Sequence, residues 1–489
     1  MVRVLLGVLL MGTDASTPTT ARSTRRATMV AALVLTACGA RTGLLVDDKM
    51  AIARDAGTQC NLSVAGKPLV LVALPDAQCH TPSLAVLEKG SAGVPASVAV
   101  LTVATLNGRS EVRATSVRIG PAWQEPVVRD RPVVVVGKSV RGPTEGVGWG
   151  HFARSADGQT LGFAFPTDED GPLRPVFRGL DIGRWSLGPS TALTAQAEST
   201  VFGLVSGSGV GAAGYSGAGY GVVWRQYVHE SDGAIEMTTL AAVLDDRGTV
   251  VLGPHPVLPP RYDARFTSLG WTGSSYLVAT GMGECPTVDP LCTPHAVVVS
   301  RLRPASGMTA SGVEHVVSIP ALRPDASPSP PSLATWGNSA WVAWFEDAPE
   351  DPRRTLRVVR LSADGAVVSP PRTLATDVAP IRFDEGGTSR TAWVGLQASE
   401  LGVVCTWSED GDTTLAPNQV GRSRVRALLL DEDAAPRGPA LTIETTMLNT
   451  LGWKRSVALS SPRSLVLAWA GRSTTSSDIV VWGARLDCL

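Results

Sequence analysis

The side chains that could act as acids, bases or metal ligands are scattered along the chain. The six histidines show no H-x-H or H-E-x-x-H spacing, which would let two imidazoles bind one zinc ion. They are His80, His151, His229, His255, His295 and His315. His229 and Glu230 beside Asp232 form a polar cluster with acid–base potential, but a turn-like region surrounds them. We expect no catalytic residue, no metal site and no cofactor, and a zinc site would have to be assembled from distant loops.

One acidic run could bind calcium. Glu409-Asp410-Gly411-Asp412 groups three carboxylates that offer oxygen ligands. The run lacks the alternating ligand spacing of an EF-hand loop. Because surface loops carry such charges for solvation as well, we expect a solvated loop and keep calcium as the alternative.

A glycine-rich run matches the dinucleotide-binding pattern G-x-G-x-x-G, from Gly209 to Gly214. That pattern binds a pyrophosphate only where a helix follows and presents its N-terminus. Here more glycines follow and then a strand-like segment from Tyr220. We therefore expect an inter-strand loop and no nucleotide.

Three segments read Ser-x-Asp-Gly, beginning at Ser155, Ser362 and Ser408. They resemble the Asp-box of sialidase-like propellers, Ser-x-Asp-x-Gly-x-x-Trp, but each lacks the residue between Asp and Gly. Hairpin turns use the same two residue types, because Asp bonds nearby backbone amides and Gly adopts positive φ. We predict three hairpin turns.

Composition limits the class of protein. The 489 residues are 44% hydrophobic and 18% charged, which is typical of a packed globular protein. The formal net charge is -1, and no basic stripe or acidic tail stands out. The sequence therefore does not favour binding to nucleic acid or to an anionic membrane surface.

The first forty residues have the pattern of an export signal. Arg22, Arg25 and Arg26 precede a short apolar run from Met29 to Ala37, which is too short to stay in a bilayer as a spanning helix. The run ends in Leu35-Thr36-Ala37-Cys38, which resembles the lipobox of bacterial lipoproteins. This resemblance implies that residues 1–37 are removed and that Cys38 carries palmitate and other acyl chains. The alternative is a plain secretory signal with an incidental cysteine.

The residues after Cys38 refine that expectation. Gly39 stands where lipoproteins of the inner membrane often carry aspartate, so the resemblance implies an outer-membrane or cell-surface location. The run Cys38-Gly39-Ala40-Arg41-Thr42-Gly43-Leu44 also looks like the mature start of lipoproteins common in myxobacteria. We expect residues 38–59 to form a tether and residues 60–489 to form the folded body.

Beyond the tether, apolar strands that end in an aromatic residue recur at regular intervals. The series is Phe165, Trp224, Thr280, Trp344, Trp407 and Trp469, with threonine replacing the aromatic residue once. A second series of turns falls at Gly120, Gly183, Gly248, Gly307 and Gly365, and again near Asp433. Both series repeat about every 60 residues, and no amphipathic helical run interrupts them.

A repeat of this length with about four strands and an aromatic residue is typical of a β-propeller blade. We interpret the aromatic residues as packing between blades, with a ligand-stacking platform as the lesser alternative. Six repeats and a final half-repeat, Ile479–Leu486, follow Gly120. An orphan outer strand, Gly66–Val72, would complete the half-repeat. The sequence therefore predicts an all-β propeller of seven four-stranded blades, closed by the N-terminal strand.

Six cysteines remain once Cys38 is set aside. If the two chain ends share a blade, Cys60 and Cys488 fall at the same hairpin end, which predicts a Cys60–Cys488 disulfide. The rival pairing is Cys60–Cys79. Cys285 and Cys292 can close a small loop, and Cys405 is either a buried free thiol or the partner of Cys79.

These expectations leave two classes of function. The first is a lipid-anchored binding or scaffold module, a monomer that presents loops to a protein or a glycan. The second is an envelope hydrolase or lyase with its site in the central channel. The missing catalytic motif favours the first class, and fold alone does not decide.

Overall fold

Runs of β-branched, aliphatic and aromatic residues form antiparallel strands along the whole described chain of this computed structural model. Every regular element in that part of the chain is a strand, and all of it belongs to one unit, Lys49–Leu489. The structure describes residues 60–74, 78–79, 82–89, 95–106, 109–120, 123–139, 151–155, 157–169, 171–194, 199–208, 218–229, 235–258, 262–284, 295–302, 312–348, 351–379, 381–382, 388–389, 394–399, 401–410, 422–448, 456–461, 463–472 and 479–488.

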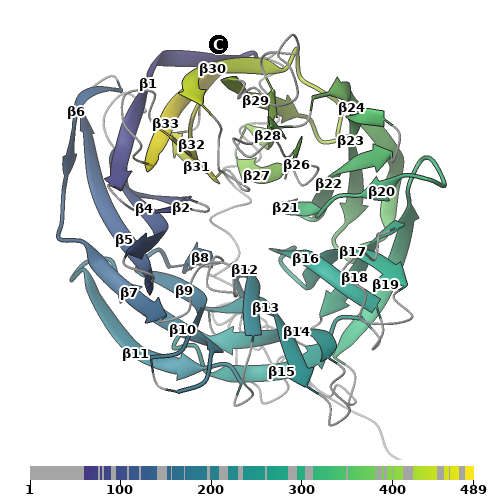
Figure 1. The fold of residues 1–489 in the computed structure, drawn as a ribbon, viewed down its shortest axis with the longest axis horizontal. Coiled ribbons are helices and arrows are strands. Elements are labelled where there is room, and N and C mark those ends of the chain that lie inside the picture. The colour runs from purple at the N-terminus through teal and green to yellow at the C-terminus, as the bar shows by residue number, and fades with distance from the viewer. Residues whose placement is uncertain are drawn as a thin grey trace, which may run out of the picture. The chain divides into compact units, whose positions relative to one another are not determined.

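The strands form seven antiparallel blades, each with four strand positions, which we number in chain order (Figure 1). Blade 1 contains β2 (Gln78–Cys79), β3 (Ser83–Lys89), β4 (Pro95–Leu106), β5 (Arg109–Gly120), β6 (Gln124–Arg129) and β7 (Val134–Ser139). Its first position is shared by β2 and β3, which both pair with β4, and its fourth by β6 and β7, which both pair with β5. Blade 2 contains β8 (His151–Arg154), β9 (Thr160–Thr167), β10 (Arg174–Asp181) and β11 (Ser186–Ala192). Blade 3 contains β12 (Ser199–Ser208), β13 (Ala218–His229), β14 (Ile235–Asp245) and β15 (Val250–Pro256).

The remaining blades follow the same order. Blade 4 contains β16 (Tyr262–Trp271), β17 (Tyr276–Glu284), β18 (Ala296–Leu302) and β19 (Val313–Pro320). Blade 5 contains β20 (Ser327–Pro328), β21 (Ser332–Trp336), β22 (Ser339–Ala348), β23 (Asp351–Ser362) and β24 (Val367–Val378), with β20 and β21 both on β22. A small pair, β25 (Ile381–Arg382) and β26 (Thr388–Ser389), precedes blade 6, which contains β27 (Gly395–Ser399), β28 (Gly402–Asp410), β29 (Arg422–Leu430) and β30 (Leu441–Leu448). Blade 7 contains β31 (Ser456–Ser461), β32 (Ser464–Arg472), β33 (Ile479–Cys488) and β1 (Leu62–Leu74).

The blades close into a ring. The first strands β3, β8, β12, β16, β21, β27 and β31 contact one another in that order, and β31 contacts β3 again. β1 is the fourth strand of blade 7 and pairs with β33, from Leu62 opposite Cys488 to Leu74 opposite Ile479. This confirms the predicted seven-bladed propeller and its closure by the N-terminal strand (Figure 1).

The aromatic series lies on the second strand of six consecutive blades. Phe165, Trp224, Thr280, Trp344, Trp407 and Trp469 are at most 1% exposed. Where the residue is aromatic, it packs against the preceding blade. Trp344, for example, clusters with Leu277 and Val299 of blade 4, and Trp469 with Val404 of blade 6. The prediction that these residues fill the spaces between blades is therefore confirmed.

The turn series lies between the third and fourth strands. Gly183, Gly248 and Gly365 fall in these turns, Gly120 ends β5, and Asp433 lies between β29 and β30. Gly307 is outside the described residues. The predicted period of the turns is thus the period of the outer hairpins.

The fourth strands, which form the outer edge of each blade, carry a repeated proline. Pro68, Pro126, Pro189, Pro254 and the pair Pro370-Pro371 each lie where the pairing with the third strand shifts register. Proline has no backbone N–H to donate to a ladder, so it is tolerated at an edge or a bulge. Five of the seven blades therefore interrupt their edge at a proline.

Candidate functional site

The two faces of the ring differ in the connections that they carry. Because strands alternate in direction, the first-to-second and third-to-fourth strand connections share one face, which we call the turn face. The second-to-third connections and those between blades share the other face, the loop face. The four longest connections, 140–150, 285–295, 379–394 and 411–421, join strand ends at the loop face, whereas the next longest, 303–312 and 431–440, join strand ends at the turn face.

Aspartate side chains stabilise turns on the turn face. Asp245 accepts backbone N–H bonds from Arg247 at 2.9 Å and from Thr249 at 2.7 Å. Asp431 accepts bonds from Asp433 at 2.9 Å and from Ala435 at 2.8 Å. Because each carboxylate accepts hydrogen bonds from the backbone of its own turn, Asp245 and Asp431 stabilise these turns.

Two of the three Ser-x-Asp-Gly segments form turns of the same kind. The Ser155 hydroxyl donates to Asp157 at 2.5 Å, and Gly158 N–H donates to the Ser155 carbonyl at 2.9 Å. The Ser362 hydroxyl donates to Asp364 in the same way. Donation from Ser155 and from Ser362 lowers the pKa of Asp157 and of Asp364, respectively.

The third segment is not a turn. Ser408 lies within β28, fully buried and opposite Val425 of β29. The ladder continues to Asp410, opposite Ser423, because the buried pairing with β29 outweighs the local turn preference of the segment. The predicted turn at Ser408 is therefore wrong.

The turn face also joins neighbouring blades. Arg360 of β23 donates to Asp433, in the outer hairpin of blade 6, at 2.9 Å. Arg301 of β18 lies 4.0 Å from Asp364 in the corresponding hairpin of blade 5. At these two positions, polar side chains of the turn face join one blade to the next.

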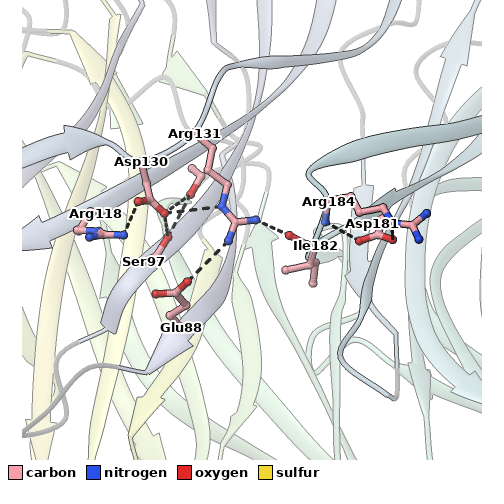
Figure 2. A network of polar contacts seen from close by, with 9 residues as sticks. Glu88, Ser97, Arg118, Asp130, Arg131, Asp181, Ile182 and Arg184 are labelled. Atoms are coloured by element: carbon pink, nitrogen blue, oxygen red, sulfur yellow. Dashed lines mark hydrogen bonds and ion pairs between the residues drawn. The ribbon is translucent and has the colours of Figure 1, made fainter.

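Blades 1 and 2 are joined by the network in Figure 2, which is centred on Asp130. The carboxylate of Asp130, between β6 and β7, accepts bonds from Ser97 at 3.0 Å and Ser116 at 3.3 Å, both fully buried. Arg118 pairs with it at 2.7 Å. These contacts anchor the point at which the outer strand of blade 1 breaks.

Arg131, next to Asp130, reaches across to blade 2 (Figure 2). It donates to the Ile182 carbonyl, pairs with Glu88 at 3.7 Å and lies over the Trp185 ring at 5.2 Å. Trp185 in turn donates to the Pro132 carbonyl at 2.7 Å. The network therefore locks two blades together.

Blade 5 holds a buried charge pair near the loop face. Arg357 of β23 lies 3.3 Å from Glu346 of β22, and their side chains are 7% and 4% exposed. Trp344 donates its indole N–H to Glu346 at 3.2 Å, and the Leu322 amide donates to the other carboxylate oxygen at 3.1 Å. Both carboxylate oxygens of Glu346 accept hydrogen bonds. Glu346 therefore links β22 to the connection between blades 4 and 5, which contains Leu322.

Blade 6 repeats this arrangement at Glu409. Trp407 donates to Glu409 at 3.4 Å, and Arg426 of β29 lies 3.4 Å from it. Glu409 was a candidate calcium ligand, but its carboxylate is already paired with a cation. Asp410 ends β28, and Gly411 and Asp412 lie outside the described residues. In the described part of the chain, no three His, Cys, Asp or Glu side chains are grouped to hold a metal ion.

The histidines are distributed over several blades. His151 begins β8, His229 ends β13, and His255 lies on β15, where burial lowers its pKa. His295 precedes β18 and is exposed, and His315 lies on β19, its Nε2 3.4 Å from the Ser318 hydroxyl. His80, Glu230 and Asp232 lie outside the described residues, as does the run Gly209–Gly214.

The structure contains a disulfide between Cys60 and Cys488. This bond excludes the rival pairing of Cys60 with Cys79, which lies on β2. Cys405 is a free thiol, fully buried on β28, and burial raises its pKa. Cys285, Cys292 and the expected lipidation site Cys38 lie outside the described residues, as do the expected signal (1–37) and all of the tether before residue 60.

Sequence reasoning missed the two Glu–Arg pairs. Their shared signal is Trp-x-Glu at the end of a second strand, in Trp344–Glu346 and Trp407–Glu409. The arginine opposite each tryptophan is fixed by strand register, which the sequence alone does not show. Among the residues that the structure describes, no helix has the length and apolar character needed to cross a bilayer.

No protein-family model matches the chain, and no curated protein matches its sequence. Solved structures that resemble it include a protein of unknown function from Dyadobacter fermentans, with a TM-score of 0.44 and 9% identity over 88% of this chain and 99% of that one. The propeller domain of the Trilobed protease from Pyrococcus furiosus gives 0.41 and 11%, over 83% and 93%. An α-L-arabinanase from Penicillium chrysogenum gives 0.42 and 12%, over 69% and 92%. These likenesses carry no information on activity or ligand.

Proposed function

We propose that this seven-bladed β-propeller is a lipid-anchored recognition module of the cell envelope, which binds a protein or a glycan through its loop face. The observation that carries the proposal is the difference between the two faces. Turn-face side chains such as Asp245 and Arg360 are engaged in forming turns and joining blades. The four longest connections join strand ends at the other face, and loops carried by a rigid scaffold commonly supply binding residues.

The entry point of the chain supports the same orientation. β1 is a fourth strand, so it starts at the turn face, and Cys60 lies two residues before its first residue, Leu62. A tether of residues 38–59 would therefore reach the body on its turn face. With Cys38 in the membrane, the loop face would point away from the lipid and toward a partner.

Photo-crosslinking in intact cells tests which face binds. A crosslinking residue in place of His295, exposed at the loop face, should capture the partner. The matched control replaces Arg247, which is exposed at the turn face. Equal capture from both positions, or capture from Arg247 alone, would contradict the proposed binding face.

The lipid anchor has its own test. Wild-type protein should incorporate palmitate and partition with the detergent-soluble envelope, because several acyl chains give stable anchoring. The Cys38→Ala variant should lose both properties. Unchanged labelling and partition of that variant would show that the lipoprotein interpretation is wrong.

A further inference from the structure

β1 is one of the two edge strands of blade 7. Among the described strands, it forms a ladder with β33 alone. Two register shifts, after Ala65 and after Val70, divide that ladder into short segments. A strand pulled from its end opens one pair at a time, because each pair in turn carries the whole force. Tension on the N-terminal side would reach the pair Leu62–Cys488 first.

The disulfide lies at this entry point. Cys60 is two residues before Leu62, is 3% exposed, and is bonded to Cys488, the last residue of β33. The chain preceding Cys60 is therefore covalently joined to β33 before β1 begins.

β33 is better secured than β1, because it pairs with strands on both of its edges. At its end, the Cys488 amide donates to the Arg463 carbonyl at 2.9 Å. The neighbouring Asp487 accepts bonds from Ser464 at 2.6 Å and from Arg485 at 2.7 Å. A force applied at Cys488 therefore meets an inner strand with contacts to β32.

We propose that the Cys60–Cys488 disulfide is a mechanical clamp, which passes tension on the N-terminal tether directly to β33 and keeps it off β1. The ring then stays closed when the tether is pulled, and reduction of the bond makes β1 detachable. The proposal rests on the tether of the proposed function for its biological setting. The clamp itself is a property of the folded body and is tested without lipid.

The test is single-molecule force spectroscopy on soluble protein that starts at residue 39. One handle is attached upstream of Cys60, and the other is attached through a bio-orthogonal side chain in place of Arg247, exposed in blade 3. Peptide mapping under non-reducing conditions first verifies the Cys60–Cys488 link. A peptide that joins Cys60 to another cysteine would overturn the proposal.

Without the bond, β1 should detach in a first event at low force, before any blade unfolds. The extension should be tens of ångströms, because β1 has 13 residues at about 3.4 Å each. The event should be absent in the oxidised protein and should appear when the same molecule is reduced in place. The Cys60→Ser/Cys488→Ser variant should show it as well, and in-place reduction keeps the test valid if this variant folds poorly.

Two results would overturn the clamp. One is the low-force event in oxidised protein, which would mean that β1 peels away despite the bond. The other is its absence in both states, which would mean that strand pairing alone resists the tension. Palmitate labelling reports on the anchor separately, so failure of the lipoprotein proposal and failure of the clamp give different results.

Discussion

At the scale of single residues, Glu346 and Arg357 form a charge pair that is almost fully removed from water. Removing one partner of such a pair leaves a buried charge without compensation. Glu409 and Arg426 form the same pair in blade 6, but their side chains are 18% and 25% exposed. Water can partly replace a lost partner in blade 6. The two blades therefore allow the same charge pair to be compared when it is buried and when it is partly exposed.

We expect Arg357→Met to lower the free energy of unfolding by about 3 kcal/mol, the lower end of the range for breaking buried pairs. The matched Arg426→Met should cost about 1 kcal/mol, because solvent screens the more exposed pair. Urea unfolding of both variants measures the difference. Equal losses would mean that burial does not decide the contribution of this pair.

Substitutions at Gly248 and Gly273 distinguish the cost of an unfavourable backbone conformation from the cost of a steric clash. Both have positive φ, +86° and +88°. A Cβ on Gly248 would lie 2.0 Å from the Phe177 side chain of the preceding blade, whereas a Cβ on Gly273 would meet nothing within 4 Å. The two positions share the left-handed backbone and differ in the space around it.

Gly273→Ala should therefore cost about 1 kcal/mol, the conformational penalty alone. Gly248→Ala should cost a further 1–3 kcal/mol or so, because Phe177 must shift in a packed core. Thermal unfolding of both variants gives the comparison. A Gly248→Ala variant as stable as Gly273→Ala would show that Phe177 moves freely.

At the scale of the elements, five of the seven outer strands have an edge that is interrupted at a proline. An unbroken edge offers a row of free N–H and C=O groups to a strand of another molecule. In β24, the pair Pro370-Pro371 removes two donors and coincides with a register shift between Arg372 and Ser369. Val367 and Val368 of the same strand are 40% and 51% exposed, so this edge is apolar at one end.

We expect the double variant Pro370→Val/Pro371→Val to associate as concentration rises, because it restores donors to an exposed apolar edge. Thr373→Val adds apolar surface to the same strand without changing the backbone and should stay monomeric. Light scattering after size exclusion distinguishes the two. Association of both variants would assign the effect to hydrophobicity and not to the proline.

The sequence predicts these elements unevenly. The aromatic and turn series are visible because each blade must bury a second-strand side chain against its neighbour and must turn before its outer strand. The Glu346–Arg357 pair depends on strand register across a hairpin, which sequence spacing does not reveal. The motif at Ser408 misleads for a related reason, because pairing with β29 decides its conformation.

At the scale of the whole molecule, the ring was predictable because the two incomplete repeats complement each other. Ile479–Leu486 lacks an outer strand, and Gly66–Val72 supplies it. Because these two ends share a blade, Cys60 falls beside Cys488, to which it is bonded. The proposed binding face was not predictable in this way, because the long connections between its strand ends follow no period.

Blade 7 also determines when the protein can finish folding. Its sheet combines β1 with β31, β32 and β33, so β1 is made before every strand of blades 1 to 6 and its partner β33 is made after them. Strand pairs so distant in sequence form slowly, because the entropy of closing the long intervening loop is lost before the stabilising contacts form. In an export route that moves unfolded chains, β1 would wait on the far side of the membrane until β33 had crossed. Pro68, which has no backbone N–H and lies at a register shift of β1, would make the unpaired strand a poorer template for another chain until the disulfide joins it to β33.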